Sequence, residues 1–218
     1  MAHNSKNLTA TVITAVVALL AAAAVFFLIW TAGRQTQQEQ QIQQQYVPTE
    51  EVASEMKQAA TDLLKGNHEV MQLFYTRGLS YQKEPYGNRP EDGFYTCASE
   101  TYKTYLDVEA LVNSVYVADE AKRILSSSRK GFTPSIDGPV YGDDGGVLGL
   151  SQDFVDENGF IAIEYDRSWA NPSFTIEPVS DIECGLKITI KDKDGSAVAL
   201  EGSMIKANGQ WRLEKFIY

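Results

Sequence analysis

The chain has 218 residues, of which 44% are hydrophobic, and its formal net charge is −10. Apart from Lys6, Arg34 and Glu39, all charged residues lie between residues 49 and 218, where 17 basic residues stand against 28 acidic ones. Such a composition argues against nucleic acid and anionic lipid as ligands and favours a basic partner. The alternative is that the acidic residues only keep the protein soluble.

The first predicted element is a membrane anchor. Residues 8–33 carry no charged side chain, and the stretch from Val12 to Trp30 is almost wholly apolar. About 20 apolar residues cross the hydrocarbon core of a bilayer as a helix. A cleavable signal peptide, the alternative, has an apolar core of about 7–15 residues and small residues at its cleavage site. We therefore expect residues 1–34 to anchor the protein, with residues 9–32 in the bilayer as a single pass and the C-terminal domain extracytoplasmic.

Residues 35–48 form a glutamine-rich linker that is too polar to build a core. Residues 49–218 suit one globular domain, and its first half has helical spacing. Thr49 followed by two glutamates predicts a helix start, and Gly66 predicts the end of that helix. A short helix is expected next, then a polar loop, then two further helices, over residues 69–76, 80–93, 107–116 and 118–128.

Beyond Gly131 the pattern changes to the two-residue alternation that is typical of strands. The strands predicted from it cover residues 160–165, 173–179, 186–192, 198–205 and 211–217. The Asp-Gly and Asn-Gly pairs between them favour tight hairpins. Helices followed by an antiparallel β-meander define an α+β domain, in which the helices cover one face of the sheet.

No pattern nominates a catalytic or metal-binding residue. Nothing orients His68, the single histidine of the domain, as a partner for Cys97 in a nucleophile pair. Two distant cysteines and one histidine are not a zinc ligand set. Residues 190–201 partly match a calcium-binding loop, but Ile190 offers no oxygen and the strand-like flanks favour a hairpin turn. We expect a protein without catalytic activity, cofactor or metal.

The two cysteines, Cys97 and Cys184, both lie outside the predicted membrane span. An extracytoplasmic location permits a disulfide between them. A bridge also requires Cα atoms within about 7 Å, which the sequence does not show. The sequence is therefore compatible with a Cys97–Cys184 disulfide and with two free thiols.

Residues 135–150 (SIDGPVYGDDGGVLGL) are the most unusual stretch of the domain, with five glycines, three aspartates and a proline around Tyr141. Glycine at this density permits backbone conformations closed to other residues. One interpretation is a mobile acidic loop that binds a partner through Asp137, Tyr141, Asp143 and Asp144, with the tyrosine as an exposed anchor. The other is a plain connection between the helices and the sheet.

Four segments together carry a resemblance to a known family. They are YKTYLDVEAL at 102–111, VADEAKRIL at 117–125, DDGG at 143–146 and GQWRLEKF at 209–216. In this order they resemble the IseA-type inhibitors of bacterial DL-endopeptidases, the cysteine enzymes that trim peptidoglycan stem peptides, over about residues 73–218.

The resemblance implies a non-enzymatic envelope protein of a Gram-positive-type cell wall that blocks the catalytic groove of an autolysin. It also implies a cleft between helical and sheet lobes and a flexible loop, here near residues 137–146. A cell-wall endopeptidase with a basic groove would then be the partner. Those inhibitors look secreted, whereas this chain is expected to be tethered, which indicates control close to the membrane.

Two other classes of protein stay open. A ketosteroid-isomerase-like cone fold also curls helices against a curved sheet, and its last strand often has a pattern like Trp211-Arg212-Leu213. That fold would make the domain a ligand-binding or envelope-assembly module without catalysis. An apolar pocket with a few polar groups would favour it, whereas an open acidic cleft would favour the inhibitor. The third class is a structural envelope subunit that assembles through the edge of its sheet.

Overall fold

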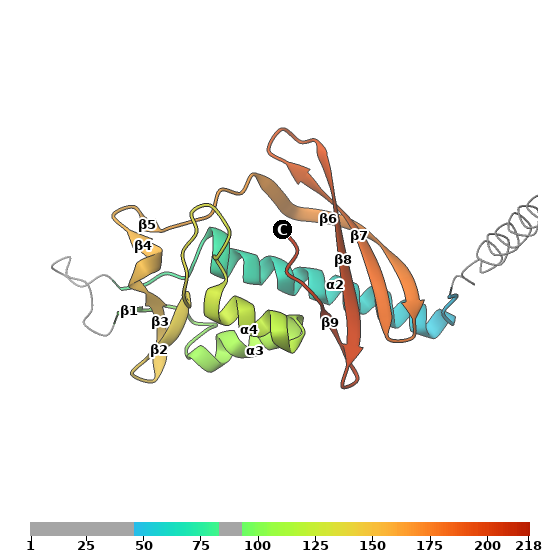
Figure 1. Cartoon of the computed structure of the whole chain (residues 1–218), viewed down its shortest axis with the longest axis horizontal. Helices are drawn as coiled ribbons and strands as arrows, with labels where there is room; N and C mark the ends of the chain where they lie inside the picture. The colour runs from blue at the N-terminus through green and yellow to red at the C-terminus, as the bar shows by residue number, and fades with distance from the viewer. Residues whose placement is uncertain (1–45, 83–92) are drawn as a thin grey trace, which may run out of the picture. The chain divides into compact units, whose positions relative to one another are not determined.

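The longest helix of the domain, α2 (Glu50–Met71), starts where the sequence predicts, since the Thr49 side chain accepts a hydrogen bond from the Val52 N–H at 3.3 Å. The computed structural model describes residues 46–82 and 93–218 (Figure 1). The predicted anchor, nearly all of the linker and most of the 80–93 loop lie outside these residues. In the described part of the chain, no helix is both long and apolar enough to cross a membrane.

The predicted end of this helix at Gly66 is wrong. Helix α2 continues through Gly66 to Met71 and passes directly into a single π-helical turn, η1 (Gln72–Thr76). A Cβ atom at position 66 would lie 2.5 Å from Val115 Cγ2, so this glycine lets the next helix approach closely. A glycine is needed at position 66 because a side chain there would clash with α3, not because the helix ends there. The helices predicted at 49–66 and 69–76 therefore form one continuous helical segment.

Helices α3 (Tyr105–Val115) and α4 (Ala118–Ser127) confirm the helices predicted from the sequence. The Asp107 carboxylate caps the start of α3, because its Oδ2 accepts hydrogen bonds from the backbone N–H of Lys103 and Thr104 at 2.9 and 2.8 Å. Four apolar side chains of these two helices are fully buried: Val108, Val112, Ala121 and Ile124.

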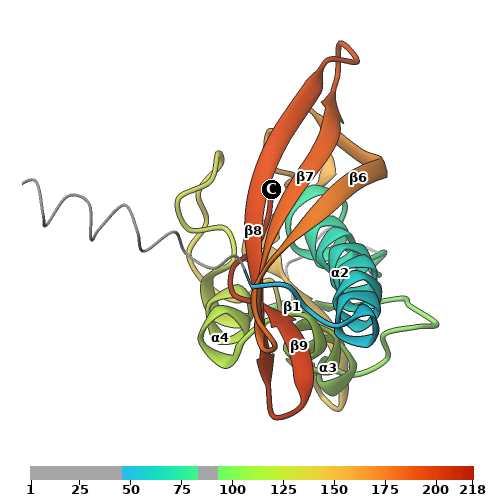
Figure 2. The same cartoon turned by 90° about the vertical axis from the view of Figure 1, so that its right-hand side faces the viewer.

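The predicted meander is an antiparallel four-stranded sheet in the order β6-β7-β8-β9. Its strands are β6 (Arg167–Ser180), β7 (Glu183–Asp192), β8 (Ala197–Ala207) and β9 (Gln210–Leu213). Asn208 and Gly209 both have positive φ, 52° and 77°, at the turn into β9, as the Asn-Gly pair predicts. Helix α2 contacts β6 and β9 and lies against one face of this sheet (Figure 2).

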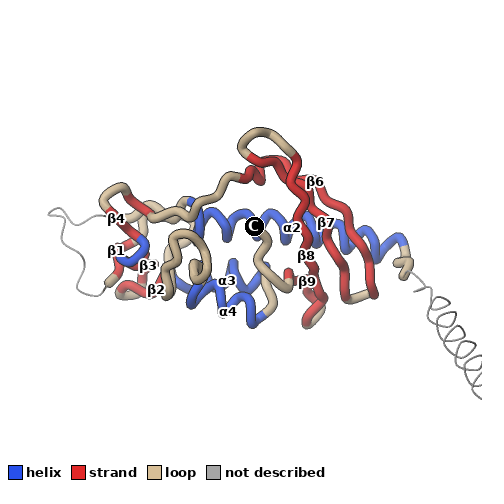
Figure 3. Tube along the Cα trace, turned by 45° about the horizontal axis from the view of Figure 1, so that its top comes forward, coloured by secondary structure: helices blue, strands red, loops and turns tan. Residues whose placement is uncertain are grey.

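The remaining strands form two smaller sheets that the sequence does not predict. A three-stranded sheet has the order β1-β3-β2, and β4 pairs with β5. The strands are β1 (Phe94–Thr96), β2 (Tyr141–Asp144), β3 (Val147–Ser151), β4 (Val155–Asp156) and β5 (Gly159–Phe160), with a short 3-10 helix, η2 (Gln152–Phe154), between β3 and β4. Figure 3 shows strands β1 to β4 near one end of α2 and β6 to β9 towards the other, with α3 and α4 in the part between.

Two predicted strands end early because their backbone groups find other partners. Of the strand predicted at 160–165, Phe160 alone is paired as a strand residue, since the N–H of Ile163 donates to the Tyr75 carbonyl at 2.8 Å. The last strand stops at Leu213, and the chain then turns into the core, where Ile217 exchanges hydrogen bonds with the Asn67 side chain. The domain is a mixture of helices and antiparallel sheet, as expected for the α+β class.

Candidate functional site

The predicted recognition loop contains a β-hairpin. Tyr141 pairs with Leu150 and Asp144 with Val147, so β2 and β3 form a regular antiparallel ladder. Gly145 and Gly146 make the turn, with φ values of 62° and 94°. The other edge of β3 pairs with β1, which holds the hairpin from its side. The interpretation of residues 135–150 as a loop is therefore wrong for its second half, which is a pair of strands.

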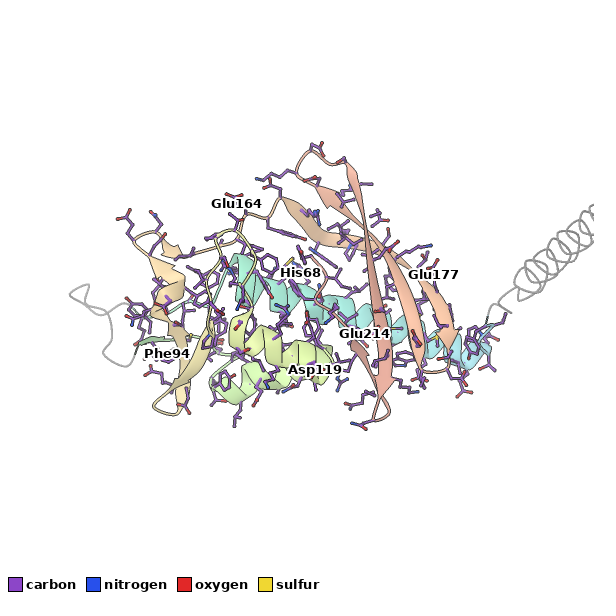
Figure 4. All side chains as sticks on the ribbon, viewed as in Figure 1. His68, Phe94, Asp119, Glu164, Glu177 and Glu214 are labelled. Carbon is purple, nitrogen blue, oxygen red and sulfur yellow. The ribbon has the colours of Figure 1, made fainter. Side chains whose placement is uncertain are left out.

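Glycine makes this small sheet possible by letting an aromatic ring lie flat on it. A Cβ atom at Gly142 would lie 2.6 Å from Phe94 Cζ, and one at Gly149 would lie 2.8 Å from Phe94 Cβ. The Phe94 ring, labelled in Figure 4, therefore covers these two paired glycines. Gly142 and Gly149, which suggest flexibility in the sequence, instead allow Phe94 to pack closely. The sequence does not indicate this contact, because Phe94 lies about fifty residues earlier.

Tyr141 is buried, so its prediction as an exposed anchor is wrong. Its side chain is 1% exposed, and its ring meets that of Phe74 edge to face at 5.2 Å. The hydroxyl donates to the Leu73 carbonyl at 2.9 Å and accepts from the Leu79 N–H at 3.1 Å. Burial raises the pKa of this hydroxyl, which stays protonated at neutral pH. Tyr141 therefore links the hairpin by hydrogen bonds to Leu73 and Leu79, in the segment that follows α2.

The three predicted aspartates do not form one cluster. Asp143 and Asp144 lie together beside the turn, where Asp143 Oδ1 accepts from the Gly146 N–H at 2.6 Å and Asp144 Oδ2 accepts from Thr96 Oγ1 at 2.6 Å. Asp137 precedes the hairpin and pairs with Lys130 at 3.3 Å. Hydrogen bonds from Ser127 and Lys130 lower the pKa of Asp137, which therefore remains a carboxylate.

Val147 completes the exposed end of the hairpin, although no sequence pattern singles it out. Its side chain is 43% exposed, and the residue pairs with Asp144 across the turn. We call residues 143–147 the hairpin tip. The tip combines two carboxylates, two glycines and one exposed aliphatic side chain on a backbone that its own hydrogen bonds hold in place.

Both cysteines are free, so the disulfide alternative is wrong. Cys97 follows β1 in the small sheet, where its N–H donates to the Leu148 carbonyl at 2.8 Å. Cys184 is buried on β7 in the large sheet. Burial, with a smaller contribution from the Asp144 charge, raises the pKa of Cys97 to about 12, so this thiol is protonated and unreactive at neutral pH.

A pocket lies between α2 and β6. Its volume is about 290 Å³. Its lining residues are Thr61, Leu64, Lys65 and His68 from α2 and Trp169, Pro172 and Phe174 from β6. The pairing of β6 with β7 is interrupted between Ser168 and Ser173, which is where the pocket opens. The lining is mostly apolar and contains no carboxylate.

His68 stacks on Trp169 in this pocket, with ring centroids 6.3 Å apart and planes 19° from parallel. Burial lowers the pKa of His68, so the imidazole is neutral at pH 7. The Trp169 indole is fixed in turn, because its Nε1–H donates to Tyr165 Oη at 2.6 Å. The side-chain contacts of His68 are with Gln72 and Trp169, and no contact with Cys97 occurs among the described residues, so the two do not form the nucleophile pair considered from the sequence.

In the described residues, no group of three or more histidine, cysteine, aspartate or glutamate side chains is arranged to hold a metal ion. Comparison of the sequence with models of known protein families finds no matching family, and a search of curated proteins finds no match. The hairpin tip and the α2–β6 pocket are the two features that bear on the functions considered from the sequence.

Proposed function

We propose that this protein is a membrane-anchored envelope protein that binds and inhibits a peptidoglycan DL-endopeptidase. Residues 9–32 would form its single-pass anchor, and residues 49–218 would face the wall on the extracytoplasmic side. The resemblance to IseA-type inhibitors over about residues 73–218 supports this proposal. The single observation that carries it is the hairpin tip, which presents acidic and apolar groups on a fixed backbone.

The hairpin tip has the chemistry to occupy a basic groove. Asp143 and Asp144 supply negative charge that steers association and sets the register of binding more than it supplies affinity. Val147 adds apolar contact area. Because β3 is paired on both edges, the tip has little freedom to lose when it binds. Inhibition of this kind is steric and needs no reactive group on the inhibitor.

The test removes the charges of the tip without breaking its turn. In the Asp143→Asn and Asp144→Asn double variant, each amide keeps an oxygen that can accept the bonds from Gly146 N–H and Thr96 Oγ1. The matched control is Asp137→Asn, which removes the same kind of charge outside the tip. The full chain in detergent micelles is titrated against a cysteine-class DL-endopeptidase while hydrolysis of cell-wall peptidoglycan is measured.

We expect the wild-type chain to inhibit hydrolysis and the double variant to need at least about tenfold more protein for the same inhibition, the loss that corresponds to about 1.4 kcal/mol. The control should stay within about twofold, because a charge outside the interface contributes little. Equal inhibition by the wild type and the folded double variant would refute the role of the hairpin tip. An enzyme that the wild type does not slow would refute the inhibitor proposal itself.

The α2–β6 pocket favours a second candidate, a ligand-binding domain of the ketosteroid-isomerase-like kind. Pockets that bind small molecules are mostly apolar with a few placed polar groups, which describes a lining that includes Leu64, Trp169 and Phe174 beside Lys65 and His68. One substitution distinguishes the ligand-binding domain from the endopeptidase inhibitor. Phe174→Arg would obstruct the pocket from its half-exposed strand position, so an apolar ligand should lose binding while endopeptidase inhibition is unchanged.

A further inference from the structure

Unpaired buried polar atoms gather at one place in the domain. In the described residues, five buried side-chain atoms lack a hydrogen-bond partner, and four of them belong to Tyr75, Ser128 and Arg129. They are Tyr75 Oη, Ser128 Oγ, Arg129 Nε and Arg129 Nη2. Folded proteins leave few such atoms unpaired, and a cluster of them needs a physical reason.

Arg129 carries a positive charge in this cluster without a carboxylate partner in the described residues. The side chain is fully buried, and its Nη1 donates to the Ile161 carbonyl at 2.6 Å. Its guanidinium carbon lies 5.8 Å from the ring centroids of both Phe154 and Phe160, so aromatic faces replace an ion pair. A buried cation that is not neutralised leaves a positive potential in its surroundings.

Tyr75 connects this cluster to a pocket at the surface. Its ring stacks on Phe216 at 4.4 Å and meets Phe132 edge to face at 5.0 Å. Both of these rings line a pocket of about 330 Å³. Burial raises the pKa of Tyr75 to about 12, and this rise is partly offset by the Arg123 guanidinium, which is within hydrogen-bonding reach of the hydroxyl, and less by the charge of Arg129. The two arginines therefore act on the same hydroxyl behind the pocket wall.

The pocket has more basic than acidic side chains, in an otherwise acidic domain. Arg123, Lys130 and Lys215 line it together with one side-chain carboxylate, Glu120, and with Tyr218, whose main-chain oxygen accepts a hydrogen bond from Arg167 at 2.9 Å. The Glu120 carboxylate is 3% exposed and already accepts two bonds from the Arg123 guanidinium at 2.9 Å and one from the Phe216 N–H at 2.8 Å. Its charge is thus compensated inside the protein.

The two lysines are the charges that a ligand can reach. Their side chains are 69% exposed for Lys130 and 78% for Lys215. Lys130 pairs with the exposed Asp137, and Lys215 lies 3.9 Å from Glu120, so both ion pairs are weak and can be exchanged for a better acceptor. Between them the pocket offers the aromatic surfaces of Phe132, Phe216 and Tyr218.

We propose that this pocket binds a small aryl phosphate, with the phosphate between Lys130 and Lys215 and the ring against Phe132 and Tyr218. A phosphate has several oxygens that accept from two ammonium groups at once. The buried Arg129 adds positive potential behind the pocket wall. The inference does not depend on endopeptidase inhibition, since the pocket residues are separate from the hairpin tip.

Phenyl phosphate is the probe, titrated by calorimetry into the full chain in detergent micelles. Lys130→Met and Lys215→Met each remove one reachable charge and keep most of the side-chain volume. Lys122→Met is the matched control, because it removes the same charge from an exposed site on α4 outside this pocket. Circular dichroism of each variant checks that it is folded.

We expect one bound phenyl phosphate per chain, an affinity at least about fivefold lower in each pocket variant, and no change above about twofold in the control. Inorganic phosphate should bind at least about tenfold more weakly than phenyl phosphate, because it has no ring to contact the aromatic surface. Three results would overturn the proposal: no heat of binding at millimolar probe, the same loss in the control, or equal affinity for the two anions. Inhibition by these variants should equal that of the wild type, which keeps this test separate from the first.

Discussion

Tyr141→Phe distinguishes a structural role for Tyr141 from the partner-binding role that the sequence predicts. The substitution deletes one oxygen atom and both of its hydrogen bonds, to the Leu73 carbonyl and from the Leu79 N–H. The edge-to-face contact with Phe74 is kept. Loss of a buried partner costs about 1–3 kcal/mol, and the Leu73 carbonyl is left without its partner in a buried residue. The Leu79 N–H belongs to a half-buried residue, which water can reach. We therefore expect a loss of about 2 kcal/mol in the free energy of unfolding.

Urea denaturation of wild type and variant measures this loss, and in a domain of this size it corresponds to a lower Tm by about 4–8 °C. Tyr105→Phe is the control, because the Tyr105 hydroxyl has no hydrogen bond to any described residue. It should change stability by less than about 0.5 kcal/mol. Inhibition or partner binding by folded Tyr141→Phe should be unchanged. A variant as stable as wild type would refute the buried tether, and a stable variant with lost binding would restore the exposed anchor.

Two further predictions concern packing and pH. Gly66→Ala should destabilise the domain by about 1–3 kcal/mol in urea despite the better helix propensity of alanine, because the new methyl would lie 2.5 Å from Val115 Cγ2. Val115→Ala in the same chain should recover part of that loss. Alkaline pH should also destabilise the domain, because Tyr75 ionises near its ordinary pKa of 10 when unfolded and only at about 12 when folded. Its contribution is complete below pH 10 and is lost as pH rises from 10 to 12, by about 1.4 kcal/mol per pH unit.

Each of these has a result that would contradict it. A Gly66→Ala domain as stable as wild type would mean that α2 and α3 are not in close contact there. For the pH prediction, the urea midpoint is followed from pH 8 to 12 in wild type and in Tyr75→Phe. An equally steep alkaline fall in both chains would show that ionisation of Tyr75 does not contribute.

Much of the helical and large-sheet structure could be predicted because its signals are local. The cap at Thr49 and the periodicity of residues 107–116 and 118–128 depend on neighbours within one or two turns, and the structure confirms them. The Asn208-Gly209 turn likewise depends on its own backbone angles. These features need no knowledge of distant residues.

The candidate site could be predicted only in part, for a reason that Gly142, Gly149 and Tyr141 make plain. Glycine permits both a flexible loop and a close contact, and the position of Phe94 decides between them. A tyrosine among glycines and aspartates reads as exposed, but the partners of its hydroxyl come from residues 73 and 79, more than sixty positions away. Asp137 precedes the hairpin and pairs with Lys130, whereas Asp143 lies at its turn, so nearness in sequence does not bring the two carboxylates together.

By itself, the amino-acid order determined the mixed α+β class, the acidic balance, the helix starts and the hairpin meander, all of which follow from composition or from interactions a few residues apart. Tertiary structure alone decided that residues 141–150 pair as a hairpin, that Gly66 lies inside a helix, and that Arg129 is buried with no carboxylate partner among residues 46–82 and 93–218. Each of these outcomes depends on which distant side chain fills the neighbouring space, and no local pattern encodes that.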